Sequence, residues 1–311
     1  MVSIKKTRIK LLIIIISIAI ILTPISTASF INTIEGTFPQ FQNKYNIQQT
    51  DGTEYWGLIF AVGEYYNNPD QNRPSMLEAA DNLYEVLIDS PHWQPDHLHL
   101  VKGSQATGQT LIKELIWLSQ NDDSDDMVLI YLTTHGSPLK NGNGLPIDLP
   151  PKDENDGADE ILVMYHGFDR WYAFIWDDLL NFFISLLSSK GVCLIVDSCY
   201  SGGFNDYPAF GQTNMESTYS ASDYIAGMTE ELASQNRVVL MSSEEHAVSY
   251  GSDFSDFLIQ GFWGWADLFG NQNGETSAEE SFYYAQFWVD LLGNQHPTIL
   301  DFYPGEFLVT I

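Results

Sequence analysis

The feature that most constrains the fold is a pair of apolar runs, each of which leads to a chemically reactive side chain. Residues 192–196 are apolar, and they continue through an acid and a serine to Cys199. Residues 127–134 form a second such run, which His135 follows directly. Short apolar runs bounded by small residues predict strands buried on both faces, as in a parallel sheet. Ligands of such sheets gather beyond the carboxyl ends of the strands, so we expect His135 and Cys199 to meet there.

The order of the remaining segments predicts an α/β fold. Apolar runs predict strands or extended segments at 55–62, 98–101, 161–165, 171–175, 237–241, 299–302 and 307–311. Helical spacing of apolar residues or acids at a first turn predicts helices at 76–88, 110–118, 177–188, 224–232, 254–269 and 277–292. A long loop is expected from Gly136 to about Asp159. Alternating strands and helices indicate a three-layer sandwich, with a mainly parallel six-stranded sheet and helices on both faces.

The N-terminal segment predicts export from the cytoplasm. Basic residues within the first ten positions precede an apolar run at 11–22, and small residues follow up to Ala28. This pattern is typical of a secretory signal peptide over residues 1–28, with an uncleaved signal anchor as the alternative. We expect a linker at 29–54 and one domain at 55–311. The protein would then be extracytoplasmic, either secreted or membrane-anchored at the outer face, and would touch a membrane only through an uncleaved N-terminal segment.

The net charge of the chain limits the classes of partner that it is expected to bind. The 311 residues carry a formal charge of −28 at neutral pH. Phosphate backbones would be repelled by such a protein, so nucleic acid is not an expected partner. A solvated acidic surface or a cationic substrate is compatible with this charge.

The two cysteines have different expected roles. Cys193 and Cys199 are six positions apart in one predicted strand and turn. At ~3.3 Å per residue of extended chain they are too distant to form a disulfide with each other. Cys193 lies in mid-strand, where a thiol packs as a small apolar group. Cys199 lies at the strand end, where a neighbouring imidazole can activate it as a nucleophile.

The two strand-end motifs together resemble those of the caspase-like cysteine peptidases, a superfamily of caspases, metacaspases, legumains and gingipains. The resemblance rests on Thr134-His135-Gly136 and on residues 197–203, and it covers roughly residues 55–300. Three further segments support the resemblance. Residues 78–83 are similar to the first helix of the family, and residues 156–160 form a D-G-x-D-E loop. Residues 175–179 match an I-x-D-D-E segment in which leucine replaces the final glutamate. The motifs are most similar to those of prokaryotic metacaspase-like members. The resemblance implies a caspase-like fold and a caspase-like peptidase domain at 55–311.

The resemblance also implies an activity and a set of site residues. Cys199 would be the nucleophile and His135 the general acid and base, and the backbone N–H groups of Gly136 and Cys199 would bind the oxyanion. Asp81 and Asp197 match acids of the metacaspase pocket for arginine or lysine. The expected function is therefore a cysteine endopeptidase that cleaves a peptide or protein substrate after basic residues.

A calcium site is a further implication of the resemblance. Metacaspases of this type place calcium on acids that correspond to Asp177, Asp178 and Asp206, together with either Asp156 or Asp159. Several carboxylates that converge would suit this hard cation. The peptidase chemistry itself requires no cofactor.

Other functions stay open at this stage. A legumain-like peptidase would use the same two residues but cleave after asparagine. A non-catalytic caspase-like module would serve in binding or surface assembly, and its Cys199 would not react with an active-site thiol probe. A serine hydrolase is disfavoured because no G-x-S-x-G motif surrounds the serines near these strands.

Overall fold

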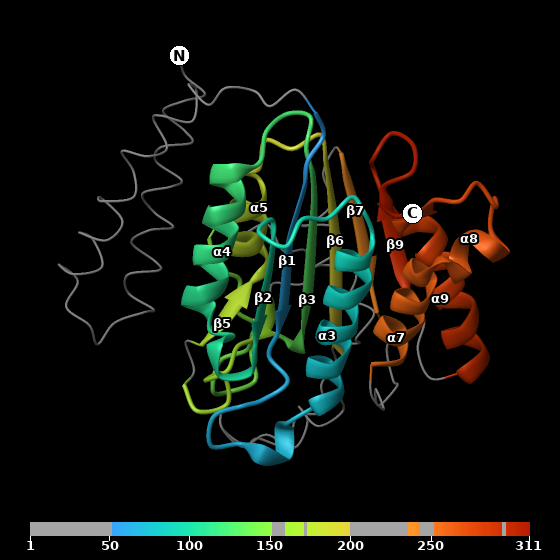
Figure 1. The fold of residues 1–311 in the computed structure, drawn as a ribbon. Helices are drawn as coiled ribbons and strands as arrows, with labels where there is room; N and C mark the ends of the chain where they lie inside the picture. The colour runs from blue at the N-terminus through green and yellow to red at the C-terminus, as the bar shows by residue number, and fades with distance from the viewer. Residues whose placement is uncertain (1–51, 151–158, 171–172, 200–235, 243–251, 294–296) are drawn as a thin grey trace. The chain divides into compact units, whose positions relative to one another are not determined.

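The computed structural model describes residues 52–150, 159–170, 173–199, 236–242, 252–293 and 297–311, and the ribbon is shown in Figure 1. Its central sheet has the strand order β2-β1-β3-β6-β7-β9. The strands are β1 (Tyr55–Ala61), β2 (Leu98–Lys102), β3 (Met127–Pro138), β6 (Gly191–Cys199), β7 (Arg237–Met241) and β9 (Thr298–Asp301). The first five strands are parallel and β9 is antiparallel to β7. The predicted mainly parallel sheet is confirmed, with six strands in this order; two further strands, described below, join it through β3 and extend the sheet to eight.

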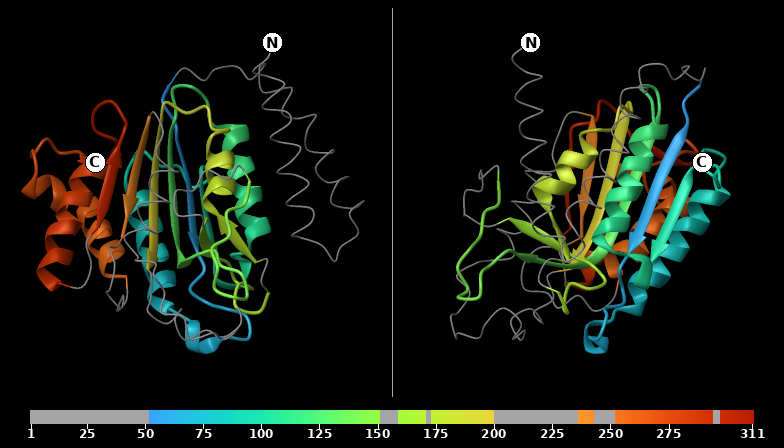
Figure 2. Two further views of the ribbon diagram at one scale, coloured as in Figure 1. Left: turned by 180° about the vertical axis from the view of Figure 1, so that it is seen from behind. Right: turned by 90° about the vertical axis from the view of Figure 1, so that its left-hand side faces the viewer.

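Helices lie on both sides of this sheet, as the side view in Figure 2 shows. The described α-helices are α3 (Pro74–Asp89), α4 (Gly108–Asn121), α5 (Asp177–Ile184), α7 (Asp253–Gln260), α8 (Ala266–Phe269) and α9 (Ala278–Leu292). One large core cluster joins apolar residues of α3, α7 and α9 to alternate residues of the strands, such as Leu129 and Ile195. Because side chains alternate across a strand, the intervening residues face the opposite side, where α4 packs.

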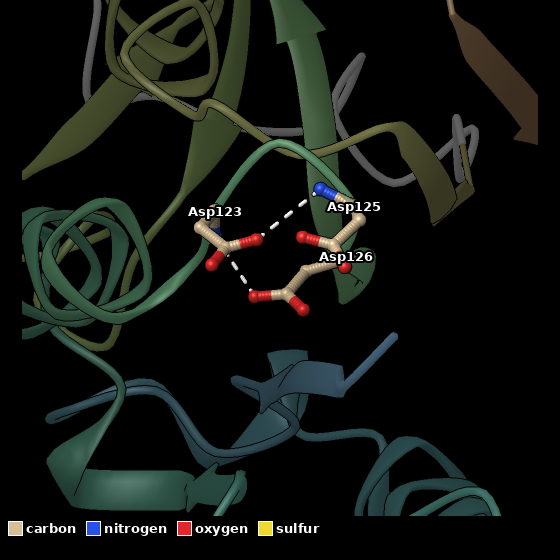
Figure 3. Close-up of side chains that lie close together, drawn as sticks. All are labelled: Asp123, Asp125 and Asp126. Carbon is tan, nitrogen blue, oxygen red and sulfur yellow. Dashed lines mark hydrogen bonds between the residues drawn. The ribbon is translucent and has the colours of Figure 1, made fainter. Parts of the chain in front are cut away.

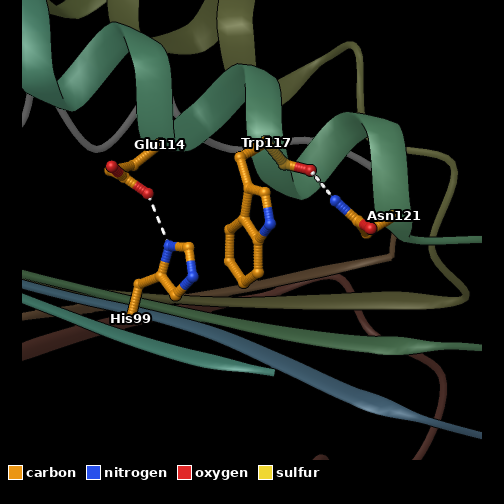
Figure 4. Close-up of polar contacts among 4 residues, drawn as sticks. All are labelled: His99, Glu114, Trp117 and Asn121. Carbon is orange, nitrogen blue, oxygen red and sulfur yellow. Dashed lines mark hydrogen bonds and ion pairs between the residues drawn. The ribbon is translucent and has the colours of Figure 1, made fainter. Parts of the chain in front are cut away.

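Histidines contribute to the packing between α4 and the sheet. The ring of His99 on β2 stacks on Trp117 of α4 with ring centroids 3.5 Å apart, and its Nδ1 lies 2.6 Å from Glu114 (Figure 4). His97 stacks in the same way on Trp56 of β1, at 3.7 Å. These imidazoles are therefore part of the interface between helix and sheet.

The predicted helix over 254–269 is not continuous. It consists of α7, a π-helical segment η6 (Gly261–Trp265), and α8. Gly264 has a φ of 91°, a left-handed conformation that suits glycine and interrupts the helix. The break leaves Trp263 and Trp265 about half exposed. The apolar spacing predicted the element but could not reveal its interruption.

Two other boundaries differ from the sequence prediction. The helix predicted over 177–188 ends at Ile184, because the buried Asp122 carboxylate accepts hydrogen bonds from the backbone N–H groups of Ser188 and Ser189. The start of the loop predicted after His135 is strand, since β3 continues to Pro138. There it pairs with β4 (Glu160–Val163), which pairs in turn with β5 (Phe174–Trp176).

The C-terminal strand has an unexpected partner. Strand β10 (Leu308–Thr310) pairs with the short β8 (Thr276–Ser277) in a separate two-stranded sheet. The sequence did not predict β8, because two residues are too few to form a recognisable pattern. The helix predicted at 224–232 lies outside the described residues.

Within the described ranges, no helix is both long and apolar enough to span a bilayer. The predicted signal segment and almost all of the predicted linker lie outside those ranges, so both remain predictions.

The packing of α3 on the sheet yields a stability prediction. Leu83 is completely buried in the core cluster. We expect Leu83→Ala to lower the free energy of unfolding by about 2–5 kcal/mol, because it removes buried methyl groups and leaves a cavity. Urea denaturation would measure the loss. Glu85→Ala, two positions along the same helix at an exposed site, is the control, and equal losses in both variants would contradict this account.

Candidate active site

The register of β3 with β6 places the two candidate catalytic residues side by side. The parallel ladder begins with Met127 opposite Gly191 and ends with His135 opposite Cys199. Neighbouring strands lie about 4.8 Å apart, so the two backbones are close at the carboxyl edge of the sheet. The structure describes the backbone of Cys199. The sequence-based expectation that these strands are neighbours is confirmed.

The ring of His135 is held by the segment that connects β1 to α3. The side chain is 1% exposed, and its Nε2 lies 2.9 Å from the backbone carbonyl oxygen of Gln71. A carbonyl can only accept, so Nε2 carries the proton in this bond and the lone pair is on Nδ1. The ring stacks on Tyr65 at 5.0 Å and meets Phe168 edge-on at 5.7 Å. The imidazole is therefore fixed in both orientation and tautomer.

Tyr65 also starts a directed chain of hydrogen bonds. The backbone N–H of His135 donates to the Tyr65 hydroxyl at 3.0 Å. That hydroxyl lies 2.9 Å from the hydroxyl of Thr134, which itself donates to the carbonyl of Val163 on β4. Since the Thr134 proton is used in the last bond, the Tyr65 hydroxyl is the donor to Thr134. The chain ties β3, β4 and the loop after β1 together around His135.

Burial keeps His135 neutral. Desolvation lowers the pKa of His135 to about 4; the Gln71 carbonyl opposes this shift, and the positive charge of Arg73 adds to it. At neutral pH the ring is therefore unprotonated, as a general base must be.

Asp197 occupies the same side of β6 as the core cluster. Its carboxylate is 2% exposed and accepts a hydrogen bond from Ser255 of α7. The hydroxyl of Tyr131 on β3 lies 2.7 Å from the Ser255 hydroxyl and must donate to it, because the Ser255 proton is used on Asp197. The pKa of Tyr131 is raised well above 10 by burial first and then by the charge of Asp197. Asp197 thus connects α7 to the edge where Cys199 lies.

Comparisons with known proteins decide the family. A family profile for the caspase domain matches residues 56–277, a range that includes both His135 and Cys199. The chain belongs to the caspase-domain family. It is therefore a member of the caspase-like cysteine peptidase superfamily, as the two motifs indicated.

Individual relatives agree with this assignment. Metacaspase-1 of Arabidopsis thaliana is 29% identical over 156 residues, which are 48% of this chain and 40% of the relative. The match thus spans less than half of either protein. The solved structure of protein GSU0716 from Geobacter sulfurreducens covers 83% of this chain and 100% of its own, with a TM-score of 0.53 and 12% identity. At that identity the likeness supports the fold alone.

In this caspase domain the two acids predicted to line a pocket have different surroundings. Asp81 is exposed on α3, and its carboxylate forms an ion pair with Lys102 of β2. Asp197 is buried beneath α7. The pKa of Asp256 of α7 is raised to about 6, mainly by burial and in smaller part by the charges of Asp197 and of Glu78 on α3. Sequence reasoning missed Glu78 and Asp256, because helical spacing alone does not show which face of α3 turns toward α7.

The other predicted site residues are only partly described. Gly136 lies opposite Leu162 in the β3–β4 ladder, next to His135. Asp177 is completely buried at the start of α5, with Asp178 beside it. Asp159 is buried and accepts the N–H of Leu149 at 2.6 Å. Asp156 and Asp206 lie outside the described residues.

A second acidic cluster has a structural role. Asp123, Asp125 and Asp126 are the described acids that bring three ligand oxygens within 4.8 Å of one another (Figure 3). They precede β3, at the opposite edge of the sheet from His135. The buried Asp126 carboxylate accepts from the N–H of Glu54 at 2.9 Å and from the indole N–H of Trp56 at 3.2 Å. These bonds fix the start of β1 against the start of β3.

The hydrogen bonds of Tyr65 generate a prediction. Tyr65→Phe removes the acceptor of the buried His135 N–H, so we expect it to lower the free energy of unfolding by about 1–3 kcal/mol. Urea denaturation would measure this. Tyr66→Phe is the matched control, since Tyr66 is exposed and makes ring contacts. An effect of the same size at both positions would be evidence against the hydrogen-bond chain.

The neutral state of His135 generates a second prediction. The pKa of His135 is lower in the folded chain than its ordinary 6.5. As pH falls from 6.5 toward 4 the unfolded chain binds the proton first, so stability falls over this window by up to about 3 kcal/mol. The difference in unfolding free energy between the wild type and His135→Asn, followed across this range, isolates the effect from the titration of the acids. Parallel pH profiles would contradict it.

Proposed function

We propose that this caspase domain is an exported cysteine endopeptidase in which Cys199 and His135 form the catalytic dyad. The observation that carries the proposal is the register that sets His135 opposite Cys199 at the carboxyl edge of two adjacent parallel strands. The neutral, oriented imidazole of His135 supports it further. The family assignment adds that relatives of this chain are cysteine peptidases.

The proposed reaction follows ordinary thiol peptidase chemistry. His135 accepts the thiol proton of Cys199, and the thiolate sulfur bonds to the scissile carbonyl carbon. The carbonyl oxygen becomes an oxyanion, which the backbone N–H groups of Gly136 and Cys199 stabilise. The C–N bond then breaks as His135 protonates the departing amine. Water hydrolyses the thioester, which releases the acid and restores the thiol.

We propose further that the peptidase cleaves after arginine or lysine. Asp197 lies two residues before Cys199 on the same side of β6, and a carboxylate there suits a guanidinium or ammonium group. Asp81 remains part of the proposed pocket, although its present ion pair with Lys102 would have to open.

Calcium binding belongs to the proposal as a regulatory element. The described acids Asp177 and Asp178 are oxygen donors of the kind that calcium prefers. Ile161 pairs with Trp176 at one end of the antiparallel β4–β5 ladder. Glu160 and Asp177 are the residues just beyond this pair, so they lie at the same end of the ladder, and both are completely buried. Asp206 would complete the set. Bound calcium would neutralise this charge and stabilise the segment between His135 and Cys199.

Two rival functions are testable beside this one. A legumain-like specificity for asparagine would use the same dyad. A binding module would keep the fold without turnover, and an electrophilic thiol probe would then fail to label Cys199.

The decisive test is hydrolysis of fluorogenic peptides that end in Arg, Lys, Asn or Asp by residues 29–311, with and without calcium. We expect turnover of the Arg and Lys peptides, and a loss of more than about a thousandfold in Cys199→Ala, because the nucleophile is removed. Calcium should raise both the activity and the melting temperature, and Asp177→Asn should remove the shift in melting temperature. Turnover of the Asn peptide alone would overturn the basic specificity, and the absence of both turnover and probe labelling would overturn the peptidase.

A further inference from the structure

A groove between two helices on the α7 side of the sheet has no part in the chemistry above. Its volume is about 380 Å³, and it lies between one face of α3 and the facing side of α7 and η6. Glu78, Asn82 and Glu85 line it from α3. Asp256, Gln260 and Trp263 line it from the other side.

The groove has an uncompensated negative charge. Three of its lining residues are carboxylates, and none of those in the described chain is basic. The pKa of Asp256 is raised to about 6, mainly by partial burial; a hydrogen bond with Ser252 opposes this shift, and the charges of Asp197, Asp253 and Glu78 add to it. A cationic ligand would relieve this repulsion.

The spacing of the acids fits an extended cation better than a metal ion. Glu78 and Glu85 are seven residues apart on α3, which is a rise of about 10 Å along the helix. Among the described residues, the three acids whose ligand oxygens approach within 4.8 Å belong to the cluster at Asp123, at the other edge of the sheet. About 10 Å corresponds to roughly three residues of extended polypeptide.

The other lining groups suit a polypeptide. The indole of Trp263 is 49% exposed and could stack against a guanidinium group. The side-chain amides of Asn82 and Gln260 can both donate to and accept from a peptide backbone. Ile259 adds an apolar wall against which the aliphatic part of a lysine or arginine could pack.

The helix α7, which forms one side of the groove, also contacts a residue of the proposed site. Ser255, the residue before Asp256, donates its hydroxyl proton to Asp197, and Asp197 is two residues from Cys199 along β6. A peptide chain bound in the groove would therefore lie along the helix that holds Asp197.

We propose that the α3–α7 groove is an accessory site for a basic segment of the polypeptide substrate, separate from the residue at the scissile bond. This inference rests on the proposed peptidase function for its choice of ligand. It predicts that the enzyme prefers substrates with several arginines or lysines near the cleaved bond over substrates with a single one.

Binding can be tested without turnover. A fluorescein-labelled nine-residue peptide with three arginines would be titrated into the full chain that carries Cys199→Ala, and anisotropy would report Kd. We expect Glu85→Gln and Trp263→Ala each to weaken binding about 2- to 5-fold, since each removes one exposed charge or cation–π contact. Asp89→Asn is the matched control, because it removes the same charge from α3 at an exposed position outside the groove.

The outcomes separate this inference from the function on which it rests. Equal Kd values for Glu85→Gln and Asp89→Asn would overturn the proposed peptide site in the groove. The site would also be overturned if free spermine displaced the labelled peptide as strongly as unlabelled peptide does. With an active enzyme, the groove variants should lose more kcat/KM on the three-arginine peptide than on a single-arginine amide, and equal losses would count against the site. Groove-dependent binding by a wild type that shows neither turnover nor thiol-probe labelling would support the groove and overturn the peptidase.

Discussion

The parallel ladder between β3 and β6 is the constraint on which the rest of the structure depends. Its nine register pairs place alternate residues such as Tyr131 and Cys193 in the core cluster under α7. A slip of one residue would turn every side chain of a strand to the other face of the sheet. The buried apolar pattern therefore fixes the register, and the register alone brings His135 to Cys199. The geometry of the candidate site is in this sense a consequence of core packing.

Polar groups at the end of these buried strands need partners that the strands cannot supply. Tyr65, from the loop after β1, accepts the His135 N–H, and Ser255, from α7, donates to Asp197. Each hydroxyl is placed by an element far away in sequence, and each bond has a defined direction. Unsatisfied polar groups in such a buried position would cost about 1–3 kcal/mol each. The same bonds that satisfy the edge of the sheet thus also hold two residues of the candidate site in place.

Sequence reasoning found most of the strands and predicted that the two ending at His135 and Cys199 are neighbours, because apolar runs and strand-end motifs are local signals. It assigned Cys193 to the core, where burial raises its thiol pKa. It did not find Glu78 or Asp256, since the face that α3 turns to α7 depends on how the helices pack. Likewise, the interruption of the helix at Gly264 and the hydrogen bond from Trp56 to Asp126 depend on tertiary contacts that the apolar periodicity of the sequence does not encode.

The shortage of basic residues explains why the buried carboxylates of this fold accept hydrogen bonds from neutral groups. With 41 acidic and 13 basic residues, most carboxylates cannot have an ion-pair partner. Those that are buried rely on neutral donors: Asp122 and Asp126 on backbone N–H groups, and Glu279 on the N–H of Phe307 at 3.0 Å, although burial still raises the pKa of Glu279 to about 7. The acids of the α3–α7 groove lie at the surface, where such donors are replaced by water. The charge that the fold leaves uncompensated at this surface is the physical basis for proposing that a basic peptide binds there.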